Sequence, residues 1–160
     1  MKKIEITSEL RIHDAIEELA PDDRHLMKQA IVARKNAYAP YSNFSVGAAV
    51  LLADQTVVLG NNQENAAYPS GLCAERVAIF NASANHPGKA ILQIAISASS
   101  SKNKVSHPVA PCGACRQSIS EYEIGQKQAI RILFMGESGE VYETASIKDL
   151  LPLSFDRSLL

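Results

Sequence analysis

All three cysteines of the chain lie in two short segments, and this arrangement constrains the fold more than any other feature of the sequence. Leu72–Arg76 holds Cys73, and Pro111–Gln117 holds Cys112 and Cys115. Zinc accepts tetrahedral sets of thiolates at neutral pH, and three thiolates leave one tetrahedral position open. An open position is typical of a catalytic zinc site, so the chain is expected to bring both segments to one ion.

Two charged side chains follow Cys73 closely and suit a reaction at such a site. Glu75 lies two positions after the first ligand, where its carboxylate can move protons to and from a hydroxide that zinc holds. Three thiolates on a dication leave a site charge of about −1, and Arg76 is placed on the same helical turn to offset it. Gln117 is expected to hold this arginine in place.

Plainer interpretations of the same residues stay open. A Cys112-x-x-Cys115 pair is also typical of a redox site or of half a structural zinc site. A fourth protein ligand would close the metal site, and His107 is the histidine nearest to the cysteines in sequence. Glu75 also suits an ordinary acid in the first turn of a helix, and Arg76 an ordinary surface cation.

Length, composition and net charge limit the class of protein to which the chain can belong. The chain has 160 residues, of which 46% are hydrophobic, and this suits one compact domain. With 16 basic and 17 acidic residues the net charge is −1, so nothing in the composition favours nucleic acid as a partner. No stretch is apolar and long enough to cross a bilayer, and the N-terminus lacks the apolar run of a signal peptide. An odd number of cysteines then predicts reduced thiols in the cytoplasm.

Helical and strand patterns alternate along the chain. An apolar face recurs at helical spacing after Pro21, and Pro40 ends this helix. Other helices are predicted from residue 73 to about 85, over 113–123 with Gly125 as the cap, and over 146–151. Roughly five strands are predicted, and they span 44–53, 56–60, 90–97, 129–135 and 141–144. Alternating strands and helices indicate a layered α/β domain, and the hairpin of the first two strands makes the sheet mixed.

The two ends of the chain carry less pattern. Residues 1–20 are treated as an N-terminal extension of unknown role, and residues 21–160 as the single domain. Within the extension, Lys3–Thr7 alternates apolar and polar residues and predicts a short strand, and Ser8–Leu19 is expected to carry a helical turn. At the other end Phe155, Leu159 and Leu160 give the tail an apolar character that is compatible with an interface.

Taken together, these segments resemble the zinc signature of the cytidine deaminases, in the small homotetrameric subclass whose zinc ligands are all cysteine. Tyr38–Ala49 is similar to the start of the family's first core strand, and Gly60–Pro69 is similar to its ribose-binding loop. The resemblance covers about Tyr38 to Phe155 and implies a three-layer α/β/α domain with a mixed, roughly five-stranded sheet. The segments that carry the zinc signature are Cys73-Ala74-Glu75-Arg76 and Pro111-Cys112-Gly113-Ala114-Cys115-Arg116-Gln117.

The resemblance implies a reaction and its catalytic groups. Cys73, Cys112 and Cys115 would bind zinc, whose hydroxide would attack C4 of free cytidine or 2′-deoxycytidine and yield uridine or 2′-deoxyuridine plus ammonia. Glu75 would carry protons to ring atom N3 and to the departing ammonia, and its carboxylate would contact the base edge together with the Ala74 backbone.

The resemblance also implies a nucleoside pocket. Asn62 and Glu64 would hydrogen-bond the ribose hydroxyls, and Phe44 would pack against the pyrimidine ring. Tyr68 and Phe155 would complete the pockets of neighbouring subunits, so a homotetramer with shared active sites is expected. Each residue has an ordinary alternative, because the aromatic residues also suit a core or an interface and the polar pair also suits a solvent-facing turn.

Three hypotheses about function follow. The first is hydrolytic deamination of free nucleosides, since a carboxylate at the sugar site disfavours phosphate and the sequence has no glycine-rich phosphate loop. The second is a related deaminase that acts on a blasticidin-like cytosine compound or on a polynucleotide, although the balanced charge disfavours polynucleotides. The third is a zinc-stapled binding module without turnover, which would need a fourth protein ligand on the metal.

Overall fold

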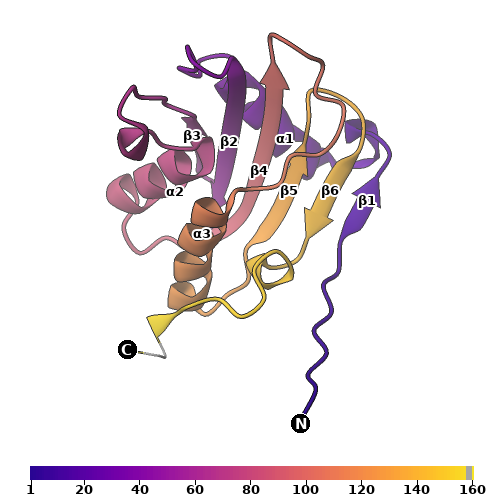
Figure 1. Ribbon diagram of the computed structural model, residues 1–160, viewed down its shortest axis with the longest axis vertical. Helices are drawn as coiled ribbons and strands as arrows, with labels where there is room; N and C mark the ends of the chain where they lie inside the picture. The colour runs from indigo at the N-terminus through magenta and orange to yellow at the C-terminus, as the bar shows by residue number, and fades with distance from the viewer. Residues whose placement is uncertain (158–159) are drawn as a thin grey trace.

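The computed structural model describes residues 1–157 and 160, and these form one mixed six-stranded sheet with helices on both faces (Figure 1). The order of strands across the sheet is β1-β6-β5-β4-β2-β3. β4 and β5 pair in parallel, and the other neighbouring strands pair antiparallel. The strands are β1 (Arg11–His13), β2 (Phe44–Leu52), β3 (Val57–Asn61), β4 (Ile91–Ser100), β5 (Arg131–Met135) and β6 (Val141–Thr144).

The helices make the molecule three layers thick. α1 (Pro21–Arg34) covers one face of the sheet, while α2 (Ala74–Asn85) and α3 (Gly113–Gln126) lie on the other face (Figure 1). α3 is the crossover that the parallel pair of β4 and β5 requires. The predicted α/β/α layering and mixed sheet are therefore confirmed, with β1 as the strand beyond the predicted five. Three short 3-10 helices complete the elements: η1 (Ile16–Glu18), η2 (Tyr68–Ser70) and η3 (Ile147–Asp149).

A separate apolar core lies on each face of the sheet. Ala48 and Val50 of β2 belong to the core under α2 and α3, whereas Ala49 between them belongs to the core under α1. The same alternation holds in β4, where Ile94 and Ala95 face opposite cores. Strands buried on both faces read as continuous apolar runs, which is why the sequence predicted β2 and β4 as covered strands.

α1 ends at Arg34, earlier than the end near Pro40 that the sequence predicted. Arg34 Nη1 donates to Ser97 Oγ at 2.7 Å, which fixes the end of the helix to β4. Further along, the backbone N–H of Tyr38 donates to the Asn62 carbonyl at 3.0 Å. The chain therefore leaves the helix to pair with the loop after β3, and this long-range contact has no local signal in the sequence.

α3 continues to Gln126, beyond its predicted end at residue 123. Gly125 lies inside the helix and is not its cap. The left-handed residue that ends the helix is Lys127, with φ of 56°. Glycine was predicted because it adopts positive φ without a steric penalty, whereas a lysine does so at a cost of about 1 kcal/mol.

The strand predicted at Lys3–Thr7 is wrong, because β1 begins only at Arg11. β1 pairs antiparallel with β6, which is itself short and ends at Thr144. Residues 1–10 therefore extend past the end of β6 and have no strand of the described chain beside them. The helical turn predicted between residues 8 and 19 is present as η1.

The division of the chain at residue 20 stays a prediction, and the tail residue Leu159 lies outside the described residues. None of the helices within residues 1–157 combines the length and the apolar character that crossing a bilayer demands.

Candidate active site

The loops that lead into α2 and α3 bring the three cysteines together. Cys73 immediately precedes α2, Cys112 immediately precedes α3, and Cys115 is buried in the first turn of α3. The Sγ atoms of Cys73 and Cys112 are 3.7 Å apart, and those of Cys112 and Cys115 are 3.5 Å apart. All three are free thiols, since a disulfide would hold its sulfurs about 2.05 Å apart.

This spacing fits a zinc ion. Zn–S bonds of about 2.3 Å in tetrahedral geometry place the sulfurs about 3.8 Å from one another, close to the observed separations. The helix N-termini beside Cys73 and Cys112 favour thiolates over thiols. Among the residues described, the cluster consists of the three cysteines alone, so His107 does not close the site. Three sulfur ligands leave one tetrahedral position for water or a substrate.

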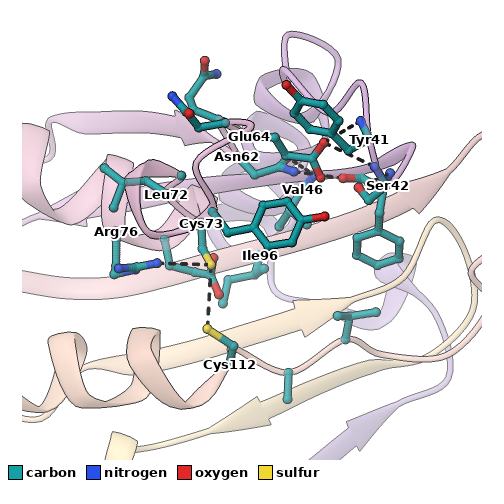
Figure 2. Close-up of a pocket in the computed structure, with 18 residues that line it drawn as sticks. Tyr41, Ser42, Val46, Asn62, Glu64, Leu72, Cys73, Arg76, Ile96 and Cys112 are labelled. Carbon is teal, nitrogen blue, oxygen red and sulfur yellow. Dashed lines mark hydrogen bonds between the residues drawn. The ribbon is translucent and has the colours of Figure 1, made fainter.

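Neighbouring groups set the ionisation of the sulfurs. The Cys115 thiol donates to the sulfur of Cys73, and together with Arg76 it lowers the pKa of the Cys73 thiol to about 5. The same contact, with burial, raises the pKa of Cys115. Arg76 Nη2 lies 3.7 Å from Cys73 Sγ (Figure 2), and the thiolate raises the pKa of the guanidinium. Arg76 is therefore charged and lies beside sulfur, as its spacing in the sequence predicted.

Glu75 lies in the first turn of α2 and is 4% exposed. Burial raises the pKa of its carboxyl above the ordinary value, and the negative charge of Cys73 raises it further. A carboxyl whose pKa moves toward neutrality both accepts and releases protons readily at working pH. The first turn of α2 therefore places a buried carboxyl next to the sulfur cluster, at the wall of a cavity.

Gln117 has a different partner from the one predicted. Its Nε2 donates to the backbone carbonyl of Phe155 at 2.8 Å, which attaches the C-terminal tail to α3. The Nε of Arg76 is buried and has no hydrogen-bond partner in the part of the chain that the structure describes. Sequence spacing alone could not show this, because the tail returns to α3 only in the folded chain.

A cavity of about 730 Å³ opens beside the sulfurs (Figure 2). Cys73 and Cys112 lie at one end of it, and Asn62 and Glu64 lie at the other, while Glu75 is also one of the lining residues. A volume of this size suits a small organic ligand held by apolar walls and a few polar groups. The site therefore joins a reactive end to a separate polar end within one cavity.

Asn62 pairs with the backbone of β2 through both ends of its amide. Its Oδ1 accepts from Val46 N at 2.8 Å, and its Nδ2 donates to the Phe44 carbonyl at 2.9 Å (Figure 2). These bonds extend the pairing of β2 beyond the end of β3. They leave one N–H and one lone pair of the amide for a ligand. Sequence reasoning predicted a ligand contact for Asn62 and missed this structural bond.

Glu64 is held by the turn that precedes β2. Its Oε2 accepts from the backbone N–H groups of Tyr41 at 2.9 Å and Ser42 at 3.3 Å (Figure 2). A hydrogen bond from the Ser42 side chain, and then the Tyr41 bond, lower the pKa of the Glu64 carboxyl. Glu64 therefore presents a negative charge at the polar end of the cavity. Tyr41 acts through its backbone, and Ser42 through both its backbone and its side chain.

The remaining predicted residues divide between the cavity and other surfaces. Phe44 and Tyr68 line the cavity, and Tyr68 is 80% exposed at its rim. Ala74 is fully buried behind Glu75 at the start of α2. Phe155 is 59% exposed and lies outside this cavity. The apolar part of the wall was missed because its residues carry no reactive group; it includes Leu72, Ile96, Val109 and Ala110.

Comparisons with known proteins agree with this site. A model of the cytidine and deoxycytidylate deaminase zinc-binding region matches residues 20–130, a range that contains the three cysteines and Glu75. The cytidine deaminase of Halalkalibacterium halodurans is 39% identical over 135 residues, which cover 84% of this chain and 94% of that protein. The chain belongs to this deaminase family. It is a zinc-dependent hydrolytic deaminase whose cysteine cluster fits Zn²⁺.

Other relatives support the same assignment. The cytidine deaminase of Sporosarcina psychrophila is 38% identical over 138 residues, which cover 85% of this chain and 93% of that protein. The crystal structure of cytidine deaminase from Burkholderia pseudomallei superposes with a TM-score of 0.71 at 42% identity, and covers 82% of this chain and 97% of that one. The family and fold that the sequence resembled are thereby confirmed.

Proposed function

We propose that the chain hydrolyses free cytidine and 2′-deoxycytidine to uridine and 2′-deoxyuridine, with release of ammonia. The observation that carries the proposal is that one cavity joins the three-cysteine cluster, through Cys73 and Cys112, to a buried carboxyl and to a polar end formed by Asn62 and Glu64. Relatives that are named cytidine deaminase support the choice of base. Three free thiols at a metal site also suit the reducing cytoplasm.

Zinc bound to Cys73, Cys112 and Cys115 would act as a Lewis acid and lower the pKa of a bound water toward neutrality. Glu75 moves the protons. It takes one proton from the attacking water and delivers it to N3 of the base, and it then takes the second and delivers it to the departing amino group. The oxygen of the water becomes the new carbonyl at C4, so the atoms balance as nucleoside plus water gives product plus ammonia. Arg76 keeps a positive charge at the Cys73 sulfur throughout.

The polar end of the cavity suits a sugar without phosphate. A carboxylate is a strong acceptor for a sugar hydroxyl, and Glu64 is held ionised by its backbone donors. The same negative charge repels a phosphate, so free nucleosides are favoured over nucleotides. Phe44 offers an aromatic face to a planar base, and the Ala74 backbone at the start of α2 offers a contact for the base edge.

Metal analysis paired with a substrate panel tests the function. The purified chain is expected to hold one zinc per chain and to decrease the absorbance of cytidine and 2′-deoxycytidine as they are converted. Cytidine 5′-monophosphate and single-stranded DNA should react far more slowly, because phosphate meets the Glu64 charge. A faster reaction with a blasticidin-like compound than with cytidine would reassign the substrate, and bound zinc without any turnover would make the chain a binding module.

Glu64→Gln is expected to raise KM for cytidine by about 10- to 100-fold while kcat changes much less, because a charge-assisted hydrogen bond to the sugar contributes about 1.5–3 kcal/mol. The amide keeps the size of the side chain but loses its charge. Steady-state kinetics on the zinc-loaded variant measure both constants. Glu17→Gln is the matched control, since Glu17 is exposed and does not line the cavity. An unchanged KM would remove Glu64 from the sugar site.

We also propose a homotetramer in which Tyr68 and Phe155 complete the pockets of neighbouring subunits. Both rings are largely exposed in a single chain, and the cavity beside Tyr68 is open at its rim. Gln117 fixes the tail that carries Phe155, so the ring is presented from a defined position on α3. Sedimentation equilibrium measures the assembly, and a fully active monomer would contradict shared sites.

A further inference from the structure

The N-terminal segment, residues 1–12, which includes the start of β1, has features that a single folded chain does not use. Residues 1–12 are all exposed, and the match to the deaminase family begins only at residue 20. In Figure 1 the segment runs away from the sheet as an extended tail. Its apolar side chains recur at even positions and are 40% to 85% exposed, at Ile4, Ile6, Leu10 and Ile12. Alternation of this kind is typical of a strand with one covered face.

The backbone shows which side of this segment is open. Glu9 N donates to Asp149 Oδ1 at 3.2 Å, and the other carboxylate oxygen of Asp149 accepts from Thr144 at the end of β6. The N–H of Glu9 therefore points toward β6. Successive backbone groups of an extended chain point in opposite directions, so those of Ser8 and Leu10 point outward. An open edge of this kind is a template for another strand.

We propose that the same segment of a second copy of this chain completes this edge, antiparallel and related by a two-fold axis at Ser8. In this pairing Ile4 faces Ile12 of the partner copy and Ile6 faces Leu10, so apolar side chains meet on one face of the sheet. Glu5 faces Arg11 on the other face. Apolar and oppositely charged pairs directly across two strands stabilise a sheet, and a self-complementary segment suits a two-fold interface.

Neighbouring registers lose this match. Pairing centred on Thr7 sets Glu5 against Glu9, and pairing centred on Glu9 sets the two copies of that residue against each other. Like charges directly across two strands are destabilising. Pairing centred on Ile6 sets Ile4 against Ser8 and leaves Ile12 beyond the end of the partner strand. Of these registers, the one centred on Ser8 alone pairs every apolar residue with another and opposes no two carboxylates.

This interface is separate from the active site. β1 is one edge of the sheet, whereas β2, whose Phe44 and Val46 line the substrate cavity, lies next to β3 at the opposite edge. Pairing through β1 therefore joins two sheets edge to edge and leaves both cavities open. The proposed pairing does not depend on whether the cavities are shared within a tetramer. It does not depend on the identity of the substrate either.

Cysteine scanning of the segment tests the register. Facing residues at a two-fold axis of antiparallel strands have Cα atoms about 4.5–5.5 Å apart, within the range that a disulfide spans. Ser8→Cys in the zinc-loaded chain is expected to form covalent dimers about tenfold faster than Ile6→Cys or Leu10→Cys, because held thiols have a higher effective concentration. The native cysteines give the same background in each variant and in the unmodified chain. Equal rates at all positions would show a tail without pairing and would overturn the proposal.

Sedimentation of Ile6→Asp gives a second, independent measurement. Ile6 lies on an exposed extended segment and belongs to neither core, so this variant is expected to fold and to keep its deaminase activity. The charge removes an apolar pair from the interface, and the unmodified chain is expected to reach twice the assembly mass of the variant across a concentration series. Equal masses at every concentration would contradict the pairing.

Discussion

Glu75→Gln is expected to keep zinc and to lose about 10²- to 10⁴-fold in kcat, since this is the usual contribution of a general acid–base group. The amide has nearly the size of the carboxyl but cannot accept a proton from water and return it to the base. Glu75 is not part of the sulfur cluster, so the metal ligands are untouched. The measurements are zinc content and steady-state kinetics with cytidine, and KM should change little.

The loss of kcat expected for Glu75→Gln cannot come from unfolding of the variant. Glu75 is 4% exposed, and burial raises the pKa of its carboxyl, so the ionised form is disfavoured in the folded chain. Its neutral amide analogue avoids the cost of burying a charge. The melting temperature of Glu75→Gln should therefore equal or exceed that of the parent. Near-normal turnover with full zinc content would remove Glu75 from the mechanism.

The sequence predicted the features that depend on neighbours along the chain. β2 and β4 were recognised because both faces of each strand are covered, which gives an unbroken apolar run. The zinc cluster was recognised because its cysteines lie at loop-to-helix junctions, where the spacing alone brings Cys112 and Cys115 together. Patterns local in the sequence were therefore enough to predict the α/β class and the end of the cavity that holds the sulfurs.

Features that depend on contacts distant in sequence were missed. β1 forms at Arg11 and not at Lys3 because β6 sets where pairing is available. Gln117 bonds the tail and not Arg76 because the chain returns to α3 after η3. The Asn62 amide is engaged by β2, a use that only the folded hairpin creates. In each case the partner is chosen by the topology of the sheet and not by the residues nearby.

Gly60→Ala is expected to destabilise the fold and weaken zinc binding together. α2 lies directly on β3 at this glycine, where a Cβ would sit 2.5 Å from the Ala74 carbonyl oxygen and 2.5 Å from Ala78 N. Both atoms belong to helix backbone, so the helix must move as a unit. Because Cys73 and Glu75 lie at the start of α2, such a shift displaces one sulfur ligand and the Glu75 carboxyl.

The expected loss of stability is about 3 kcal/mol, at the upper end for overpacking of a well-filled interior. For a chain of this size that corresponds to a fall in melting temperature of about 10 °C. Thermal unfolding and competition with a zinc chelator measure the two effects. Gly113→Ala is the matched control for stability, since a Cβ there meets no atom within 4 Å and alanine is the better helix former. If Gly60→Ala has the melting temperature of the parent chain and binds zinc as tightly, the backbone contact of α2 with β3 does not position the metal site.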